Sequence, residues 1–143
     1  MKTLTIEWKH LDQDSRTCDR CGDTGKTLRQ TVRRLRRCLQ PRGIAVRLLE
    51  TKLTAGRLAE SNTILFNDVP LETVLGDARA GSSDCDSCGE LLDAKVQCRT
   101  LERAGKTHEA IPAEVICEAA CRVASCEDCG CSEGKSCGPQ CGC

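Results

Sequence analysis

The sequence predicts an α/β fold in which a strand–helix–strand unit is followed by a further strand, a hairpin and a C-terminal helix. Leu4, Ile6 and Trp8 alternate with polar residues, as expected of a half-buried strand. Residues 23–39 carry apolar side chains at helical spacing, and residues 43–50 form a second apolar run. A unit of this kind implies two parallel strands joined by a right-handed crossover.

The expected helix begins at Asp23 or Thr24, either of which can cap it, and ends before Pro41. Its apolar side chains recur at intervals that place them on a stripe about 60° wide. They are Leu28, Val32, Leu35 and Leu39. Five arginines cover the other faces, namely Arg29, Arg33, Arg34, Arg36 and Arg37. We expect a solvated face there, with binding of an anionic partner as the alternative.

The elements expected after this unit are short. In order they are a helix over residues 54–59, a strand over 63–66, an amphipathic stretch to residue 75, a loop over 76–90, a hairpin of residues 96–101 and 107–111, and a helix from Pro112 to about Ala124. The hairpin turn is expected at residues 104–106, which include a glycine.

Composition limits the core and excludes several function classes. The 143 residues carry 21 Lys and Arg against 21 Asp and Glu, so a dedicated nucleic-acid or membrane-surface binder is not expected. Leu, Ile, Val and Phe number only 28, which predicts a small aliphatic core.

No apolar run approaches the roughly 20 residues of a membrane span, and no targeting signal is visible. We therefore expect a cytoplasmic protein. Motifs for nucleotide binding and serine hydrolysis are missing, and we expect no organic cofactor.

Fourteen cysteines dominate the chemistry of the chain. In a reducing compartment, such chains are more often metal-binding or catalytic than disulfide-stapled. Cys18 and Cys21 form a C-x2-C pair between the first strand and the helix, where a helix N-terminus favours a thiolate. The pair predicts either a redox couple, in which Cys18 attacks and Cys21 resolves, or half of a tetrahedral metal site.

A second C-x2-C pair, Cys85 and Cys88, lies in the expected loop. It can reach the first pair to complete a metal site with four cysteine ligands, or it can exchange electrons with the first pair as a redox relay. Cys38 and Cys98 are expected to be simply buried, as isolated cysteines usually are.

The remaining thiols form a third group towards the C-terminus. They are Cys117, Cys121, Cys126, Cys129, Cys131, Cys137, Cys141 and Cys143. Residues 125–143 contain no Leu, Ile, Val or Phe, so alone they cannot offset the entropy of ordering. Their composition resembles that of a metallothionein, and thiolate ligands select soft or borderline ions such as Zn²⁺, Cd²⁺, Cu⁺, Hg²⁺ or As(III). Helical projection places Cys117 and Cys121 opposite the apolar stripe of the last helix, facing this tail.

The first C-x2-C pair has the position of the redox motif in the thioredoxin-like fold, and residues 64–68 resemble a strand and turn of glutaredoxins. Seven segments within residues 3–124 together resemble a prokaryotic domain of unknown function regarded as thioredoxin-like. They are Ile6-Glu-Trp-Lys9, Thr17-Cys-Asp-Arg-Cys21, Glu60-Ser-Asn-Thr-Ile64, Pro70-Leu-Glu72, Cys85-Asp-Ser-Cys-Gly89, Cys98-Arg-Thr100 and Glu109-Ala-Ile-Pro-Ala-Glu114. The resemblance implies a fold and no established activity. Where thioredoxins place a cis-proline, this chain has Ser61 or Asn62, which argues against a groove for substrate disulfides.

We therefore expect a thioredoxin-like α/β domain over residues 1–124 and a disordered or metal-organised Cys-rich tail over residues 125–143. The expected function is to bind or buffer soft metal or metalloid ions, Zn²⁺ among them. The expected ligands are Cys18, Cys21, Cys85, Cys88, Cys117, Cys121, Cys126, Cys129, Cys131, Cys137, Cys141 and Cys143. Two alternatives stay open: a dithiol–disulfide oxidoreductase with Cys18 and Cys21 as catalytic thiols and a thiol-redox partner protein, and a structural zinc module that binds a protein partner.

Overall fold

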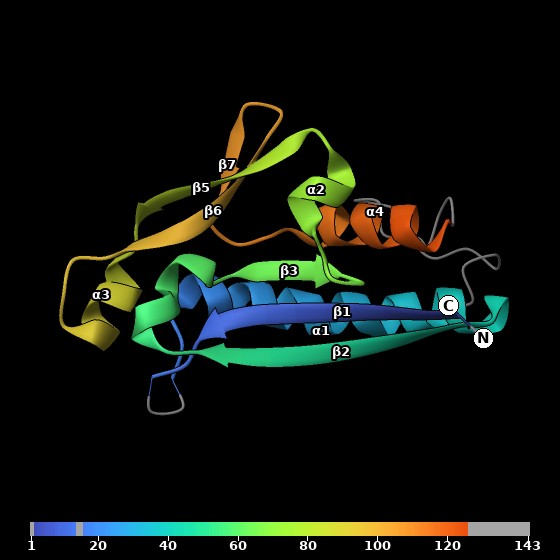
Figure 1. The fold of residues 1–143 in the computed structure, drawn as a ribbon, viewed down its shortest axis with the longest axis horizontal. Helices are drawn as coiled ribbons and strands as arrows, with labels where there is room; N and C mark the ends of the chain where they lie inside the picture. Colours follow the sequence, from blue (N-terminus) through green and yellow to red (C-terminus); the bar gives the residue numbers. More distant parts are fainter. Residues whose placement is uncertain (1, 14–15, 126–143) are drawn as a thin grey trace.

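The computed structural model describes residues 2–13 and 16–125 (Figure 1). Its elements are β1 (Lys2–Leu11), α1 (Asp19–Leu39), the 3-10 helix η1 (Gln40–Arg42), β2 (Ile44–Leu53), the 3-10 helix η2 (Ala55–Glu60), β3 (Thr63–Phe66), β4 (Val69–Pro70), α2 (Leu71–Leu75), β5 (Ala78–Asp84), α3 (Asp86–Leu92), β6 (Gln97–Arg103), β7 (Lys106–His108) and α4 (Ala113–Ala124). The expected mixed α/β architecture is confirmed.

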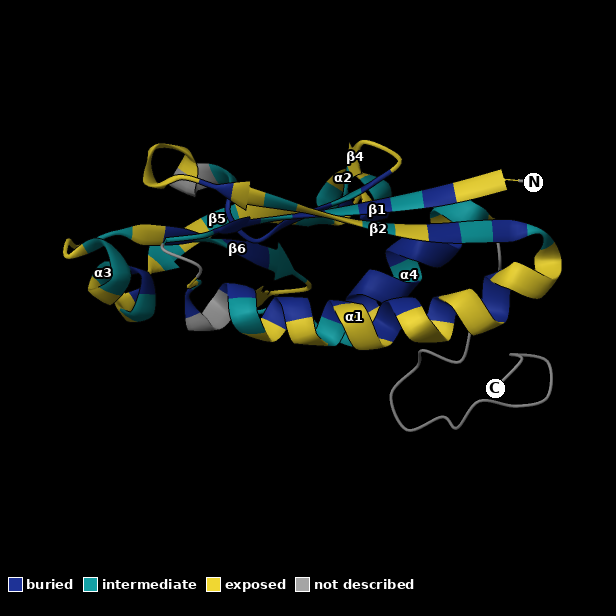
Figure 2. Cartoon of the chain, turned by 90° about the horizontal axis from the view of Figure 1, so that it is seen from below, coloured by how far each residue is buried: buried dark blue, intermediate teal, exposed yellow. Residues whose placement is uncertain are grey.

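The strands form two sheets, with the orders β2-β1-β3-β4 and β5-β6-β7. β1 and β2 are parallel over their full length, from Lys2 opposite Ile44 to Leu11 opposite Leu53, which confirms the expected parallel pair. β3 runs antiparallel to β1 on its other side. Helices α1 and α4 pack together against this first sheet, as Figures 1 and 2 show.

The core lies between the first sheet and these two helices. The alternating side chains of β1 and the apolar stripe of α1 point into it, each at most 3% exposed. They are Leu4, Ile6, Trp8, Leu28, Val32, Leu35 and Leu39. Figure 2 shows the resulting alternation of buried and exposed residues along α1. The five arginines lie on the exposed face, as expected.

Trp8 packs directly on the backbone of α1 at Gly25. A Cβ atom at Gly25 would lie 2.3 Å from Cη2 of the Trp8 ring, with two more ring atoms within 2.9 Å. Gly25→Ala is therefore expected to lower the free energy of unfolding by about 1–3 kcal/mol, despite the gain in helix propensity. The loss is measured by urea denaturation. Gly22→Ala is the matched control, because its nearest neighbour is the Thr17 methyl at 4.0 Å. Equal stability in both variants would contradict this packing.

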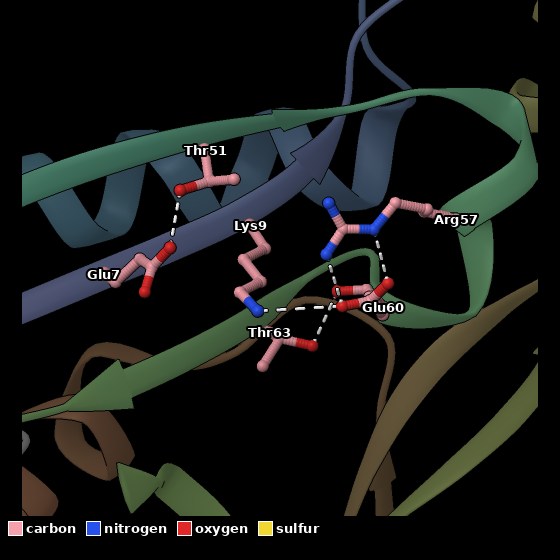
Figure 3. Close-up of polar contacts among 6 residues, drawn as sticks. All are labelled: Glu7, Lys9, Thr51, Arg57, Glu60 and Thr63. Atoms are coloured by element: carbon pink, nitrogen blue, oxygen red, sulfur yellow. Dashed lines mark hydrogen bonds and ion pairs between the residues drawn. The ribbon is translucent and has the colours of Figure 1, made fainter. Parts of the chain in front are cut away.

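The turn between β2 and β3 is held by a small polar network (Figure 3). Arg57 donates two hydrogen bonds, of 2.7 and 2.8 Å, to the carboxylate of Glu60. The Lys9 ammonium lies 3.6 Å from the same carboxylate, and the Thr63 hydroxyl donates to the Glu60 carbonyl at 2.7 Å. These contacts join β1, η2 and β3, although exposed ion pairs of this kind contribute little stability.

The second half of the chain is more regular than the sequence predicts. The expected loop over residues 76–90 is wrong, because β5 pairs with β6 from Ala78 opposite Arg103 to Asp84 opposite Gln97. Long-range pairing overrides the low strand propensity of this Gly- and Ser-containing segment. The hairpin of β6 and β7 and the helix after Pro112 are confirmed, with slightly different bounds. No described helix has the length and apolar character needed to cross a membrane.

Candidate metal centre

Both C-x2-C pairs lie at the start of a helix. Cys18 is the N-cap residue of α1, which begins at Asp19, earlier than the sequence predicts. Cys85 is likewise the N-cap residue of α3. Side chains at the N-cap and three positions later meet across the first turn, as in a capping box. This geometry brings Cys21 next to Cys18, and Cys88 next to Cys85.

Four sulfur atoms from three separate segments converge at one end of the molecule. Cys18 comes from the start of α1, Cys85 and Cys88 from α3, and Cys98 from β6. Their Sγ atoms all lie within 4.8 Å of one another. A tetrahedral thiolate site with Zn–S bonds of about 2.3 Å places its sulfurs about 3.8 Å apart. A small contraction of this group, here called the cysteine quartet, therefore suffices to surround one ion.

The β5–α3–β6 segment supplies three of the four sulfur atoms of the quartet. The Cys85 N–H donates to the Val96 carbonyl at 3.1 Å, which closes the ends of the segment around α3. Cys98 pairs across the two strands with Ser83, which lies just before Cys85 in the chain. Figure 1 shows α3 at the end of the molecule where β1 ends and α1 begins. Cys18, at the start of α1, joins the quartet there. The site therefore connects the two sheet units of the fold.

The quartet is closed to solvent. The exposed fractions of its side chains are 1% for Cys18, 4% for Cys85, 0% for Cys88 and 1% for Cys98. Four protein ligands without an open position are typical of structural zinc sites, whereas catalytic sites keep one position for water or substrate. The Cys85 sulfur also lies 3.6 Å from the Ser87 hydroxyl, so it has a polar neighbour in the first turn of α3.

Cys21 lies beside the quartet without belonging to it. Its thiol is 1% exposed and hydrogen-bonded to Cys18. Hydrogen bonds from the thiols of Cys21 and Cys98 lower the pKa of Cys18 well below its ordinary range. The same hydrogen bonds, followed by burial, raise the pKa values of Cys21 and Cys98. Burial is the main cause of the raised pKa of Cys88. Cys18 therefore ionises more readily than Cys21, Cys88 and Cys98.

The structure brings together three of the four ligands expected for a shared site. Cys18, Cys85 and Cys88 converge as expected, but Cys98 takes the place that the spacing assigned to Cys21. The expectation that Cys98 is simply buried was incomplete, since it is buried among thiols. The sequence held one signal for this role. Cys98 lies on β6, the next strand after the helix that carries Cys88, so it is close in the chain to the second C-x2-C pair.

The cysteines of α1 and α4 are placed differently from expectation. Cys117 and Cys121 are 2% and 8% exposed, so the expectation that they face away from the core is wrong. The reason is that α4 packs against α1, α2 and the first sheet, which bury its flanks. Cys38 is buried, as expected, and both Cys38 and Cys117 are disulfide-bonded. Metal binding by Cys117 stays a prediction that requires reduction of its bond.

The six remaining expected ligands lie outside the described residues. They are Cys126, Cys129, Cys131, Cys137, Cys141 and Cys143. Their role in metal binding, and the division of the chain into a domain over residues 1–124 and a tail over 125–143, stay predictions.

Comparison with known proteins identifies the family. A family model described as "Domain of unknown function (DUF2703)" matches residues 4–120. The chain belongs to the DUF2703 family. An "Uncharacterized protein" of Archaeoglobus fulgidus is 34% identical over 117 residues, which cover 79% of this chain and 82% of that protein. No solved structure matches the chain. The resemblance to an uncharacterised family is thus confirmed, whereas the thioredoxin-like assignment stays a prediction. The quartet lies within the DUF2703 match and the tail lies beyond it.

Proposed function

We propose that this chain is a thiolate-based metal-binding protein in which Cys18, Cys85, Cys88 and Cys98 hold one soft or borderline ion such as Zn²⁺. The convergence of four buried sulfurs from three segments within 4.8 Å carries the proposal. Thiolate-only ligand sets favour Zn²⁺, Cd²⁺ and Cu⁺ over hard cations such as Mg²⁺ and Ca²⁺. Burial of all four sulfurs favours a retained ion over a transiently bound one.

The Cys-rich tail is proposed to add capacity for further ions. Its six thiols in residues 126–143 include C-x-C and C-x2-C steps, which place neighbouring sulfurs on one ion. Binding would displace thiol protons and order a segment that cannot fold by burial alone. In this proposal the quartet holds one ion firmly, and the tail buffers soft metal or metalloid ions in the cytoplasm.

A dithiol–disulfide oxidoreductase is the second candidate, because the Cys18 thiol has a lowered pKa and a hydrogen-bonded neighbour, Cys21. The position of the pair between β1 and α1, with β1 parallel to β2, also supports a thioredoxin-like arrangement. Both thiols are only 1% exposed, however, so a protein disulfide cannot reach them in this conformation. Turnover of a model disulfide that disappears in Cys18→Ser would favour the oxidoreductase.

Metal stoichiometry tests the proposed function. Full-length protein is purified without oxygen and compared with a full-length variant in which all six cysteines of residues 126–143 are serine. Elemental analysis is expected to find two or more ions per chain in the first protein and one in the second. The absence of metal from both, together with a readily reversible Cys18–Cys21 disulfide, would contradict metal binding and favour the oxidoreductase.

The affinity for Zn²⁺ is expected to rise steeply with pH. The pKa values of Cys88 and Cys98 are raised, so both thiols stay protonated near neutral pH until the ion displaces their protons. Displacement of at least these two protons changes the apparent affinity by about 100-fold or more per pH unit. Competition titrations of the six-serine variant at pH 6, 7 and 8 measure this slope. An affinity that does not change with pH would contradict thiolate coordination.

A further inference from the structure

One buried thiol of the site has no place in the proposed coordination sphere. Cys21 is hydrogen-bonded to Cys18, yet it is not among the four sulfurs that lie mutually within 4.8 Å. When the quartet holds an ion, Cys21 therefore stays next to a metal-bound thiolate without serving as a ligand. The C-x2-C spacing that separates the two residues is the spacing of dithiol–disulfide couples.

We propose that Cys18 and Cys21 form a redox release couple, in which oxidation by a peroxide withdraws the Cys18 ligand and expels the ion. This inference rests on the proposed function, because it requires an ion in the quartet. It assigns Cys21 the role of resolving thiol. It also differs from oxidoreductase activity, since the product is a released ion rather than a reduced substrate protein.

The chemistry balances with one molecule of hydrogen peroxide. The Cys18 thiolate attacks one peroxide oxygen, the O–O bond breaks, and Cys18 sulfenic acid and hydroxide form. The Cys21 sulfur then attacks the Cys18 sulfur, which forms the disulfide and releases the sulfenic oxygen as water. The Cys21 proton and one proton from solvent complete two water molecules. Two electrons pass from the sulfurs to the peroxide, and the ion is left with three thiolate ligands.

Burial determines which oxidant can react. Cys18 and Cys21 are both 1% exposed, so a small peroxide is a better match than a protein disulfide, which must dock on the attacked sulfur.

The identity of the disulfide distinguishes this release from other oxidations. Cys85 and Cys88 are both quartet members, whereas the Cys18–Cys21 pair contains one ligand and one non-ligand. Oxidation of this pair therefore removes one ligand and leaves the other three in place.

The test uses the full-length six-serine variant loaded with Zn²⁺, so that the zinc released comes from the quartet and not from the tail thiols. Its bound zinc is counted first. Hydrogen peroxide is then added, and released Zn²⁺ is followed with a chromogenic chelator. The same protein carrying Cys21→Ser is compared with a control carrying Cys121→Ser, which removes a buried thiol outside the quartet. Cys21→Ala serves as a second variant if Cys21→Ser does not fold.

Trypsin separates the possible disulfides after alkylation of free thiols. Cleavage after Arg16, Arg20 and Lys26 places Cys18 and Cys21 on different peptides, so their disulfide links residues 17–20 to residues 21–26. Cys85 and Cys88 stay together on the peptide of residues 80–95, and Cys98 lies on residues 96–99. Mass spectrometry therefore identifies the oxidised pair directly.

We expect the parent and the Cys121→Ser control to release zinc as the linked 17–20/21–26 peptide appears. Release from the Cys21→Ser protein is expected to be at least tenfold slower, and dithiothreitol is expected to restore binding in the parent. Equal release rates with and without Cys21, or release that accompanies a Cys85–Cys88 disulfide, would overturn the inference. If the zinc count before oxidation is zero, the proposed function has failed, and the inference fails with it for that separate reason.

Discussion

Replacing Cys98 by serine is expected to lower the affinity for Zn²⁺ by more than about 100-fold, which exceeds the usual loss from a residue that only supports a ligand. β6 supplies no other quartet sulfur, and a serine hydroxyl does not ionise near neutral pH to take the place of a thiolate. Competition titration of the six-serine variant, with and without Cys98→Ser, measures the loss.

Two further variants make this result specific. Cys21→Ser removes a buried thiol that touches the quartet, and Cys121→Ser removes one on α4. Both are expected to bind Zn²⁺ within a few-fold of the parent. A large loss with Cys21→Ser and none with Cys98→Ser would instead support the ligand set that spacing alone suggests, with Cys21 in place of Cys98.

Removing the ion is expected to lower the free energy of unfolding by about 4 kcal/mol when free Zn²⁺ stands at about 1,000 times its dissociation constant. The reason is that the quartet joins the start of α1 to the β5–α3–β6 segment, and the unfolded chain does not hold these sulfurs together. Urea denaturation of the six-serine variant with and without a chelator measures the difference. An unchanged midpoint, despite bound zinc, would contradict a site that links the two sheet units.

Hydrogen exchange shows how far this stabilisation extends. If loss of the ion exposes only the amides near α3 and the ends of β5 and β6, the site stabilises a local segment. If the amides of β1 and α1 also lose protection, the whole described fold depends on the ion, as a structural zinc module requires. The first outcome favours the buffering function, and the second favours the structural alternative.

Local patterns in the sequence predicted the first sheet unit well. The alternation in β1 and the spacing of Leu28, Val32 and Leu35 report burial directly, because one face of each element meets the core. β3 was predicted with its observed bounds from a short continuous apolar run. Periodicity was sufficient to find these elements, whereas the capping residues Asp23 and Thr24 placed the start of α1 too late in the chain.

The β5–α3–β6 segment could not be predicted in the same way. Its residues have low intrinsic strand propensity, and β5 exists through its pairing with β6. Cys98 joins the quartet because this pairing places it beside α3, which spacing alone does not reveal. Spacing suggested Cys21 instead, since a C-x2-C pair often gives both sulfurs to one ion. Three-dimensional convergence, rather than spacing, separates the ligands from the neighbouring thiol.

X-ray absorption at the edge of the bound metal shows whether four sulfur atoms surround the ion. The six-serine variant is purified without oxygen and loaded with one equivalent of Zn²⁺, and its spectrum is compared with that of the same protein carrying Cys98→Ser. We expect four sulfur neighbours at about 2.3 Å in the parent and no intact four-sulfur shell in the variant. A shell of nitrogen or oxygen atoms, or four sulfurs that persist without Cys98, would contradict this expectation.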